Sequence, residues 1–202
     1  MVIVSLLLSA PYVMAQATNS NNEYDALYYI SASKRFGKFS VAAYTEFTID
    51  YTTPSLNYDY SLLGVKYKLL PWLDTAIYGG YMESGNTKKW VHVFQLIQTF
   101  GWGNTKLWFS EKVCHRRDIH SGSNEGLIRL RGNLQYHIPN TVIMPFVSSE
   151  TYLWDEWKRT NIHAGARWKI SRVITLSTYY MASVRPTLTK HFLVIGLSFS
   201  IQ

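Results

Sequence analysis

Several segments of this chain alternate between apolar and polar residues with a period of two over ten or more positions. The clearest is 127–138, where Arg129 and Arg131 fall on one face while Leu130 and Leu134 fall on the other. Strands of soluble proteins usually have about 5–6 residues, whereas a tilted membrane-spanning strand needs about 9–11. A face with two arginines requires water or counter-charges, and the opposite face suits lipid. The pattern predicts the strands of a membrane barrel.

The same alternation recurs at 161–170 and at 193–201. Applied to the whole chain, it predicts eleven strands, at 24–33, 38–50, 57–69, 73–83, 89–101, 104–114, 125–138, 142–154, 160–170, 172–182 and 190–202. Bacterial single-chain barrels normally have an even number of strands. We therefore expect an all-β fold, an antiparallel transmembrane β-barrel of 10–12 strands, with twelve slightly preferred.

The predicted connections alternate in length. Short turns containing Gly, Pro, Asn or Ser are expected around 34–37, 71–72, 102–103, 139–140 and 171. Longer polar loops are expected near 50–56, 84–88, 115–124, 155–159 and 183–189. Short turns on the periplasmic side and longer loops on the extracellular side are typical of bacterial barrels.

The first seventeen residues differ from the rest of the chain. They carry no charge, have an apolar core at 2–8 and end in Ala15-Gln16-Ala17, which resembles a secretory signal peptide cleaved after Ala15 or Ala17. The cationic stretch that usually precedes such a core is missing, which favours a start internal to the true one. A short buried segment is the alternative. No apolar run in the sequence reaches the ~20 residues of a membrane-spanning helix. We expect a signal peptide at 1–17 and a single barrel domain at 18–202.

Composition favours an exported barrel over an exported soluble protein. Aromatic residues make up 15% of the chain, which suits girdles at two membrane interfaces. The formal charge is 20 − 13 = +7. Because an exported chain meets no nucleic acid, we expect the cations to contact outer-membrane lipid and lipopolysaccharide and to form ion pairs inside the barrel. The single cysteine, Cys114, excludes an internal disulfide.

The order of these segments resembles a bacterial family known as "domain of unknown function 2490", whose members are proposed outer-membrane barrels. The matching features are Glu111, Arg116 and Arg117, and then the stretches "SASKRFGKFSVAAYTEF" (31–47), "LIRLRGNLQYHIP" (127–139), "PFVSSETYLW" (145–154) and "RTNIHAGARWKIS" (159–171), followed by a strand with Tyr179, Tyr180 and Met181. The resemblance covers nearly the whole chain after residue 17. It implies a barrel and supplies no activity.

The last predicted strand is similar to the carboxy-terminal signal that the barrel-assembly machinery reads. Gly196, Phe199 and Ile201 supply its alternating pattern. The sequence departs from that signal in ending on Gln202 and in having Val194 where a polar residue is common. The match predicts the barrel-assembly machinery as a partner.

Charged residues on the polar faces of the predicted strands are expected to point into the barrel. They are Arg129, Arg131, Arg167 and Lys169, with Glu46, Glu111 and Glu150 from other strands. One interpretation is a network of ion pairs that plugs and stiffens a narrow barrel. The other is a narrow anion-selective pore, in which unpaired guanidinium groups attract carboxylate or phosphate solutes.

The segment 115–124 is either a plain surface loop or the place of one of two kinds of chemistry. Some barrels of this size are lipid hydrolases, and His120 and Ser123 are the candidate catalytic pair. Their spacing of three puts them on opposite faces of a strand, which argues against the pair. Cys114, His115 and His120 lack the paired spacing of a zinc site, so we predict no metal and no cofactor.

The sequence therefore predicts an outer-membrane β-barrel that acts as a structural protein or as a narrow channel for small solutes, and it leaves open whether such a channel favours anions. Two alternatives stay open. One is an outer-membrane lipid hydrolase or deacylase that uses His120 and Ser123, and the other is a surface-binding protein that acts through its extracellular loops.

Overall fold

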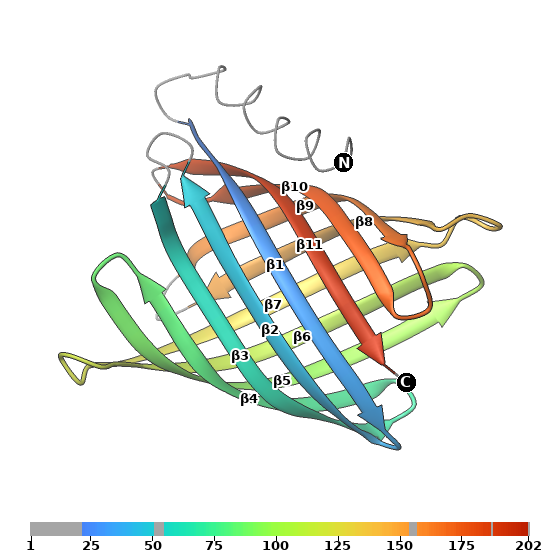
Figure 1. The fold of residues 1–202 in the computed structure, drawn as a ribbon, viewed down its shortest axis with the longest axis horizontal. Helices are drawn as coiled ribbons and strands as arrows, with labels where there is room; N and C mark the ends of the chain where they lie inside the picture. The colour runs from blue at the N-terminus through green and yellow to red at the C-terminus, as the bar shows by residue number, and fades with distance from the viewer. Residues whose placement is uncertain (1–21, 51–54, 154–156, 187, 202) are drawn as a thin grey trace.

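The computed structural model describes residues 22–50, 55–153, 157–186 and 188–201, and these residues form a closed, all-β barrel (Figure 1). Its eleven strands are β1 (Asn22–Phe36), β2 (Phe39–Asp50), β3 (Ser55–Leu70), β4 (Leu73–Ser84), β5 (Thr87–Trp102), β6 (Thr105–Asp118), β7 (Asn124–Tyr136), β8 (Ile143–Leu153), β9 (Trp157–Lys169), β10 (Ile174–Val184) and β11 (Thr189–Ile201). Within these residues, no helix is long and apolar enough to cross a membrane. The predicted signal peptide at 1–17 lies outside the described residues.

Each strand pairs with its neighbour in the sequence in antiparallel fashion, and β1 pairs with β11 to close the barrel. The closing pair is parallel and runs from Asn22↔Thr189 to Lys34↔Ile201. An odd number of strands forces this arrangement, because the first and last strands then point the same way. The predicted barrel of 10–12 strands is confirmed, with eleven strands rather than the preferred twelve.

Tight turns hold the hairpins together. Gly37, Gly85 and Gly103 have φ of 61°, 56° and 56°, the left-handed conformation that two-residue hairpin turns favour. The turn at Gly85 replaces the longer loop expected at 84–88, because glycine lets β4 and β5 join directly. Conversely, the connection from β7 to β8 spans 137–142 where a short turn was expected. The predicted contrast between short and long connections is therefore weak in this fold.

The outer surface of the barrel is mainly apolar. Leu63, Ile77 and Val147 are 62%, 65% and 55% exposed, and they lie between two bands of aromatic side chains. The band at the β5–β6 turn end contains Phe36, Phe39, Tyr67, Trp72, Phe100, Trp102 and Tyr136, and the band at the other end contains Tyr28, Phe47, Tyr81, Trp90 and Tyr180. The aromatic girdles expected from composition thus have counterparts on the surface.

The inner surface divides into two regions. We call the first the apolar wall: it is a cluster of buried side chains from β3 to β8, namely Tyr60, Leu62, Met82, Val91, Val93, Cys114, Leu127 and Tyr152. We call the second the polar wall: it consists of the inward side chains of β7, β8 and β9, namely Arg129, Arg131, Asn133, Ser148, Glu150, Asn161 and His163. A smaller apolar cluster of Met181, Phe192 and Val194 lies on β10 and β11.

Candidate functional site

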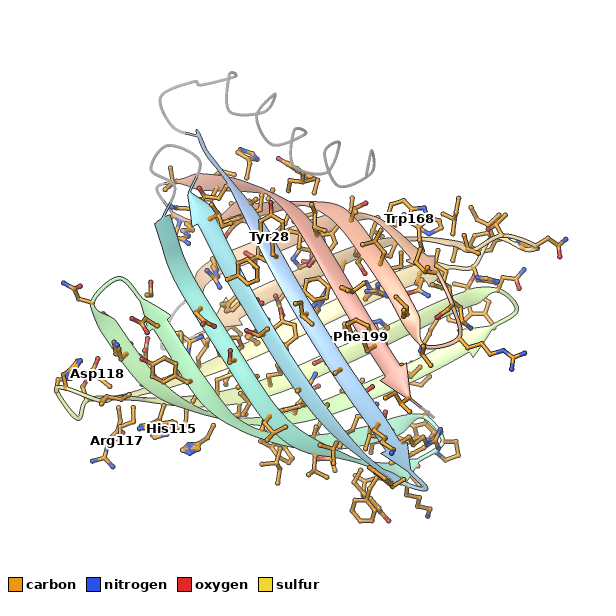
Figure 2. The ribbon with its side chains drawn as sticks, viewed as in Figure 1. Tyr28, His115, Arg117, Asp118, Trp168 and Phe199 are labelled. Carbon is orange, nitrogen blue, oxygen red and sulfur yellow. The ribbon has the colours of Figure 1, made fainter. Side chains whose placement is uncertain are left out.

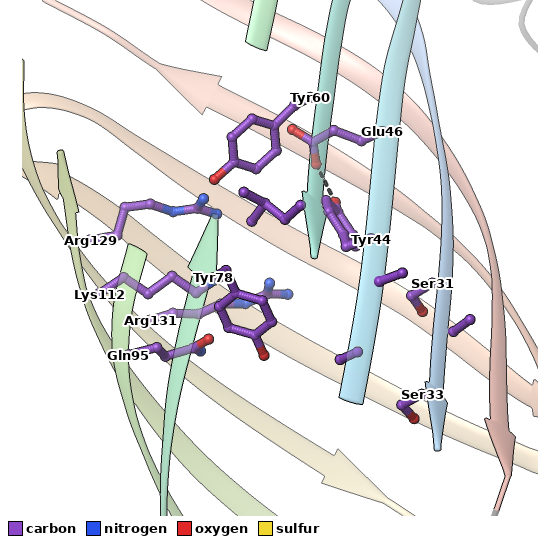
Figure 3. A pocket seen from close by; sticks show the side chains of 14 residues that line it. Ser31, Ser33, Tyr44, Glu46, Tyr60, Tyr78, Gln95, Lys112, Arg129 and Arg131 are labelled. Carbon is purple, nitrogen blue, oxygen red and sulfur yellow. Dashed lines mark hydrogen bonds between the residues drawn. The ribbon is translucent and has the colours of Figure 1, made fainter. Parts of the chain in front are cut away.

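The most informative place in the molecule is a cavity of about 310 Å³ inside the barrel, seen in close-up in Figure 3. Arg129 and Arg131 reach it from β7, and Lys112 reaches it from β6. Residues two apart on a strand point to the same side, so the alternation of β7 places both guanidinium groups inside. Of the described residues that line the cavity, three are cationic and one, Glu46, carries a carboxylate.

Arg129 is held by a buried carboxylate on the neighbouring strand. Its Nη2 lies 2.6 Å and its Nε 3.0 Å from Oε1 of Glu150, which is 3% exposed. The hydroxyl of Tyr152 donates to the other Glu150 oxygen at 3.0 Å, and the Arg129 guanidinium lies 4.8 Å from the centre of the Tyr152 ring. Hydrogen bonds from two residues therefore fix the carboxylate, and one carboxylate neutralises one of the cavity's three cations.

Arg131 lies on the polar wall without a carboxylate of its own. Its Nε donates to the hydroxyl of Ser148 at 3.0 Å, and its guanidinium lies 5.1 Å from the Trp108 ring centre. The same hydroxyl is 3.2 Å from Nδ1 of His163. Among the described residues Arg131 forms no ion pair, so its charge remains available to a solute.

Lys112 and Glu46 complete the charges of the cavity from facing sides. Lys112 forms no hydrogen bond or ion pair with the part of the chain that the structure describes. Glu46 accepts a hydrogen bond from Tyr44 on its own strand and faces the cationic side across the cavity (Figure 3). With Glu150 counted against Arg129, Lys112 and Arg131 leave an excess of positive charge on that side.

The charged side chains nearer the two ends of the barrel differ in their partners. Lys89 forms an ion pair with Glu125, and Lys66 lies 3.2 Å from Asp74. Arg167 donates to Gln135 and lies 4.4 Å from the ring centre of Phe146. Lys169 shares the inward parity of Arg167, but it is the last residue of β9 and is exposed. Lys66 and Lys89 therefore have carboxylate partners, whereas Arg167 and Lys169 form no ion pair with the described residues.

Glu111 does not point into the barrel, against expectation. Ser110 and Cys114 are buried on the inner side of β6, so Glu111 lies on the outer side with Phe109 and Val113. The physical reason is the strict alternation of β6, whose inward positions are the even-numbered ones. Glu111 pairs in register with Leu96 and Leu130, which places it in an apolar part of the surface.

The loop at 119–123 does not bring the candidate catalytic pair together. The hydroxyl of Ser123 is 2.9 Å from that of Ser121, and the backbone N–H groups of His120 and Ser121 donate to Asp118. Both His120 and Ser123 are exposed. These contacts describe a self-contained surface turn, and no described contact gives Ser123 a histidine base.

The candidate metal ligands are separated by the barrel wall. Cys114 is buried on the inner face of β6, and His115 is exposed on the outer face of the same strand. No group of three or more His, Cys, Asp or Glu side chains suited to a metal ion occurs among the described residues.

The residues of the predicted assembly signal lie on β11 in two different environments. Gly196 is buried beneath Tyr29, whose ring atoms lie within 2.5 Å of where a Cβ would stand. Phe199 and Ile201 are on the outer face, and Ile201 is 51% exposed. Their role in assembly stays a prediction.

Sequence reasoning missed Lys112 and the inward tyrosines Tyr44, Tyr60 and Tyr78. The sequence does contain a signal for Lys112. It lies an even number of residues from Ser110 and Cys114, and so on their face of β6. The apolar residues of the opposite face are Leu107, Phe109 and Val113. The tyrosines were expected at the girdles. The three inward tyrosines pack their rings against other side chains of the interior, and their hydroxyls lie near charged groups. Composition alone does not show that a tyrosine takes this position.

No family model and no curated protein matches this chain. Among solved structures, the chain is similar to the NanC porin in a rhombohedral crystal form, with a TM-score of 0.55 and 14% sequence identity over 87% of this chain and 97% of that chain. At this level of identity the similarity concerns the fold. The architecture is therefore that of a porin-like β-barrel.

Proposed function

We propose that this protein is an outer-membrane channel for small anionic solutes, which cross along the polar wall. The observation that carries the proposal is the cavity lined by Lys112, Arg129 and Arg131, where Glu46 is the one carboxylate among the described lining residues. Cations that a protein does not neutralise internally attract anions in a confined, partly desolvated passage. The porin-like fold supports the same class of function.

The outer surface supports placement in a membrane. Trp90 and Trp102 mark the two aromatic bands on β5 and are twelve residues apart. At about 3.3 Å per residue and a tilt of about 40°, this spacing corresponds to roughly 30 Å between the bands. Membrane barrels carry an apolar band about 25 Å tall between aromatic girdles. The apolar side chains between the two bands match that requirement.

The test is the reversal potential of the refolded protein in a planar bilayer under a salt gradient. We expect discrete conductance steps with a reversal potential of the sign that indicates anion preference. The double variant Lys112→Gln, Arg131→Gln removes the two cations of the cavity lining that form no ion pair with the described residues, and it should shift the reversal potential towards zero. Both glutamines retain a polar side chain of similar length, which keeps the passage hydrated.

The matched control is the double variant Lys38→Gln, Arg172→Gln, which removes two exposed charges outside the barrel strands. This control should leave the reversal potential of the parent unchanged. A folded protein that gives no conductance would refute the channel. Equal shifts in both double variants would refute the role of the cavity cations.

A further inference from the structure

A second concentration of basic side chains lies on the outer surface, near the free end of the β6–β7 hairpin. His92 on β5 and His115 on β6 are register partners, and their rings stack with centroids 6.2 Å apart and planes at 25°. Arg117 follows on the same face of β6 and pairs in register with Trp90. Figure 2 labels His115 and Arg117 near this end of the barrel.

The histidine pair is flanked by two glycines. Gly79 pairs in register with His92, and Gly126 pairs with His115, so four strands contribute one row across the surface. A Cβ atom at either glycine would have no atom within 4 Å. The row therefore has two imidazoles at its centre and open space on each side, which makes room for a group larger than water.

Three acidic groups of the neighbouring strands at this end of the barrel already have partners. Glu83 lies 3.4 Å from Lys88 and accepts from Tyr81 at 3.1 Å, and Glu125 forms an ion pair with Lys89. Asp118 accepts the backbone N–H groups of His120 and Ser121 at 2.9 Å and 2.7 Å. Arg117 forms no hydrogen bond or ion pair with any described residue, so its charge has no partner in that part of the chain.

The aromatic band indicates the depth of this patch. Trp90 is 54% exposed and packs edge-on against Tyr81 at a centroid distance of 6.0 Å. Tryptophan and tyrosine prefer the headgroup level of a bilayer. Arg117 stands beside Trp90, and the histidine pair lies one row closer to the middle of the strands. Basic groups at the headgroup level face the phosphates of the lipids and not bulk water.

We propose that His92, His115 and Arg117 form a binding site for the phosphate of an anionic membrane lipid. The proposal rests on the membrane placement in the proposed function and goes beyond it by naming a lipid site on the outer wall. A guanidinium group supplies the charge and a forked pair of donors, and each imidazole supplies an N–H whether it is neutral or charged. The open spaces at Gly79 and Gly126 accommodate the remainder of the headgroup.

The experiment is a titration of the full-length refolded barrel, in neutral detergent, with short-chain phosphatidic acid, followed by native mass spectrometry. The triple variant His92→Gln, His115→Gln, Arg117→Gln should bind the first lipid about tenfold more weakly than the parent. The control is Lys38→Gln, which removes one exposed charge from a turn at the other end and should bind as the parent does. Phosphatidylcholine should bind parent and triple variant alike.

Heat-modifiable migration in gels establishes that each variant is folded. If the triple variant does not fold, Arg117→Gln and Arg117→Lys carry the test. The glutamine variant should weaken binding severalfold, and the lysine variant should weaken it less, because lysine keeps the charge and loses only the forked pair of donors. Equal affinities in parent and variant would overturn the site. Displacement of the lipid by an equal concentration of inorganic phosphate would also overturn it, since the site would then take free anions.

Insertion into vesicles of pure phosphatidylcholine separates this inference from the proposed function. A barrel that inserts there but shows no preference for phosphatidic acid would refute the lipid site and leave the channel standing. A barrel that does not insert would refute the membrane placement itself.

Discussion

The two walls inside the barrel are built from the same kind of alternating strand, but the side chains that they present to the interior differ. The apolar wall buries residues such as Val91 and Val93, which are 0% and 2% exposed, and it is packed like a protein core. The polar wall holds guanidinium, carboxylate and imidazole groups joined by hydrogen bonds. Alternation decides which side chains point inward, whereas residue type decides whether that interior is dry or hydrated. The two walls meet at the cavity, where Arg129 and Arg131 of the polar wall face Tyr60 and Leu62 of the apolar wall.

The largest effect is expected from removing the carboxylate of the polar wall. Glu150→Ala leaves Arg129 buried without its counter-charge and should lower the free energy of unfolding by about 3–5 kcal/mol. Denaturant unfolding in lipid vesicles measures this loss. The control is Glu83→Ala, whose partner Lys88 is exposed, and it should cost less than about 1 kcal/mol. Equal small losses would mean that water already solvates Arg129.

Creating a new cavity in the apolar wall by mutation should lower the free energy of unfolding nearly as much. Leu127 is 6% exposed within the apolar cluster, so Leu127→Ala should lower the free energy of unfolding by about 2–5 kcal/mol. Leu130→Ala on the outer face of the same strand should cost less, because Leu130 is 42% exposed to the membrane and lipid chains can fill the space that alanine leaves. The same unfolding experiment compares the two. Similar costs would show that the wall is not packed as a core.

A smaller loss of stability is expected where β11 packs against β1, on the side of the barrel that belongs to neither wall. Gly196→Ala places a methyl group 1.9 Å from a ring atom of Tyr29, which must move. Overpacking of this kind should cost about 1–3 kcal/mol. Gly79→Ala adds the same group where no atom lies within 4 Å and serves as the matched control. If both variants unfold at the same denaturant concentration, the packing of β11 against β1 is looser than described.

The smallest effect is expected from removing the negative charge of Glu46, which faces the polar wall across the cavity. Glu46→Gln keeps an acceptor for the Tyr44 hydroxyl but removes the negative charge from the cavity lining. The reversal potential under a salt gradient should move modestly further in the direction of anion preference. A shift towards cations would place the selective step elsewhere along the passage.

Sequence patterns predict this barrel well where a strand has one clearly polar face. In β7 the two arginines alternate with Ile128 and Leu130, and both arginines lie inside. In β6 the outward residues include Glu111 and His115, which interrupt the apolar face and made Glu111 look inward. The pairing of Arg129 with Glu150 could not be predicted, because it depends on the register between strands, which a single strand does not encode.

The parallel pairing of β1 with β11 limits how the chain can be circularly permuted. In a barrel with antiparallel closure, the last strand ends where the first begins, and a short linker can join them to give a circular permutant. Here Ile201 lies beside Lys34, while Asn22 lies beside Thr189 at the other end of the strand pair. A linker from 201 to 22 must span about 40 Å along the barrel, since thirteen residues at about 3.3 Å separate the two ends. New termini at any hairpin therefore require a connection of a dozen or more residues, as every parallel strand pair does.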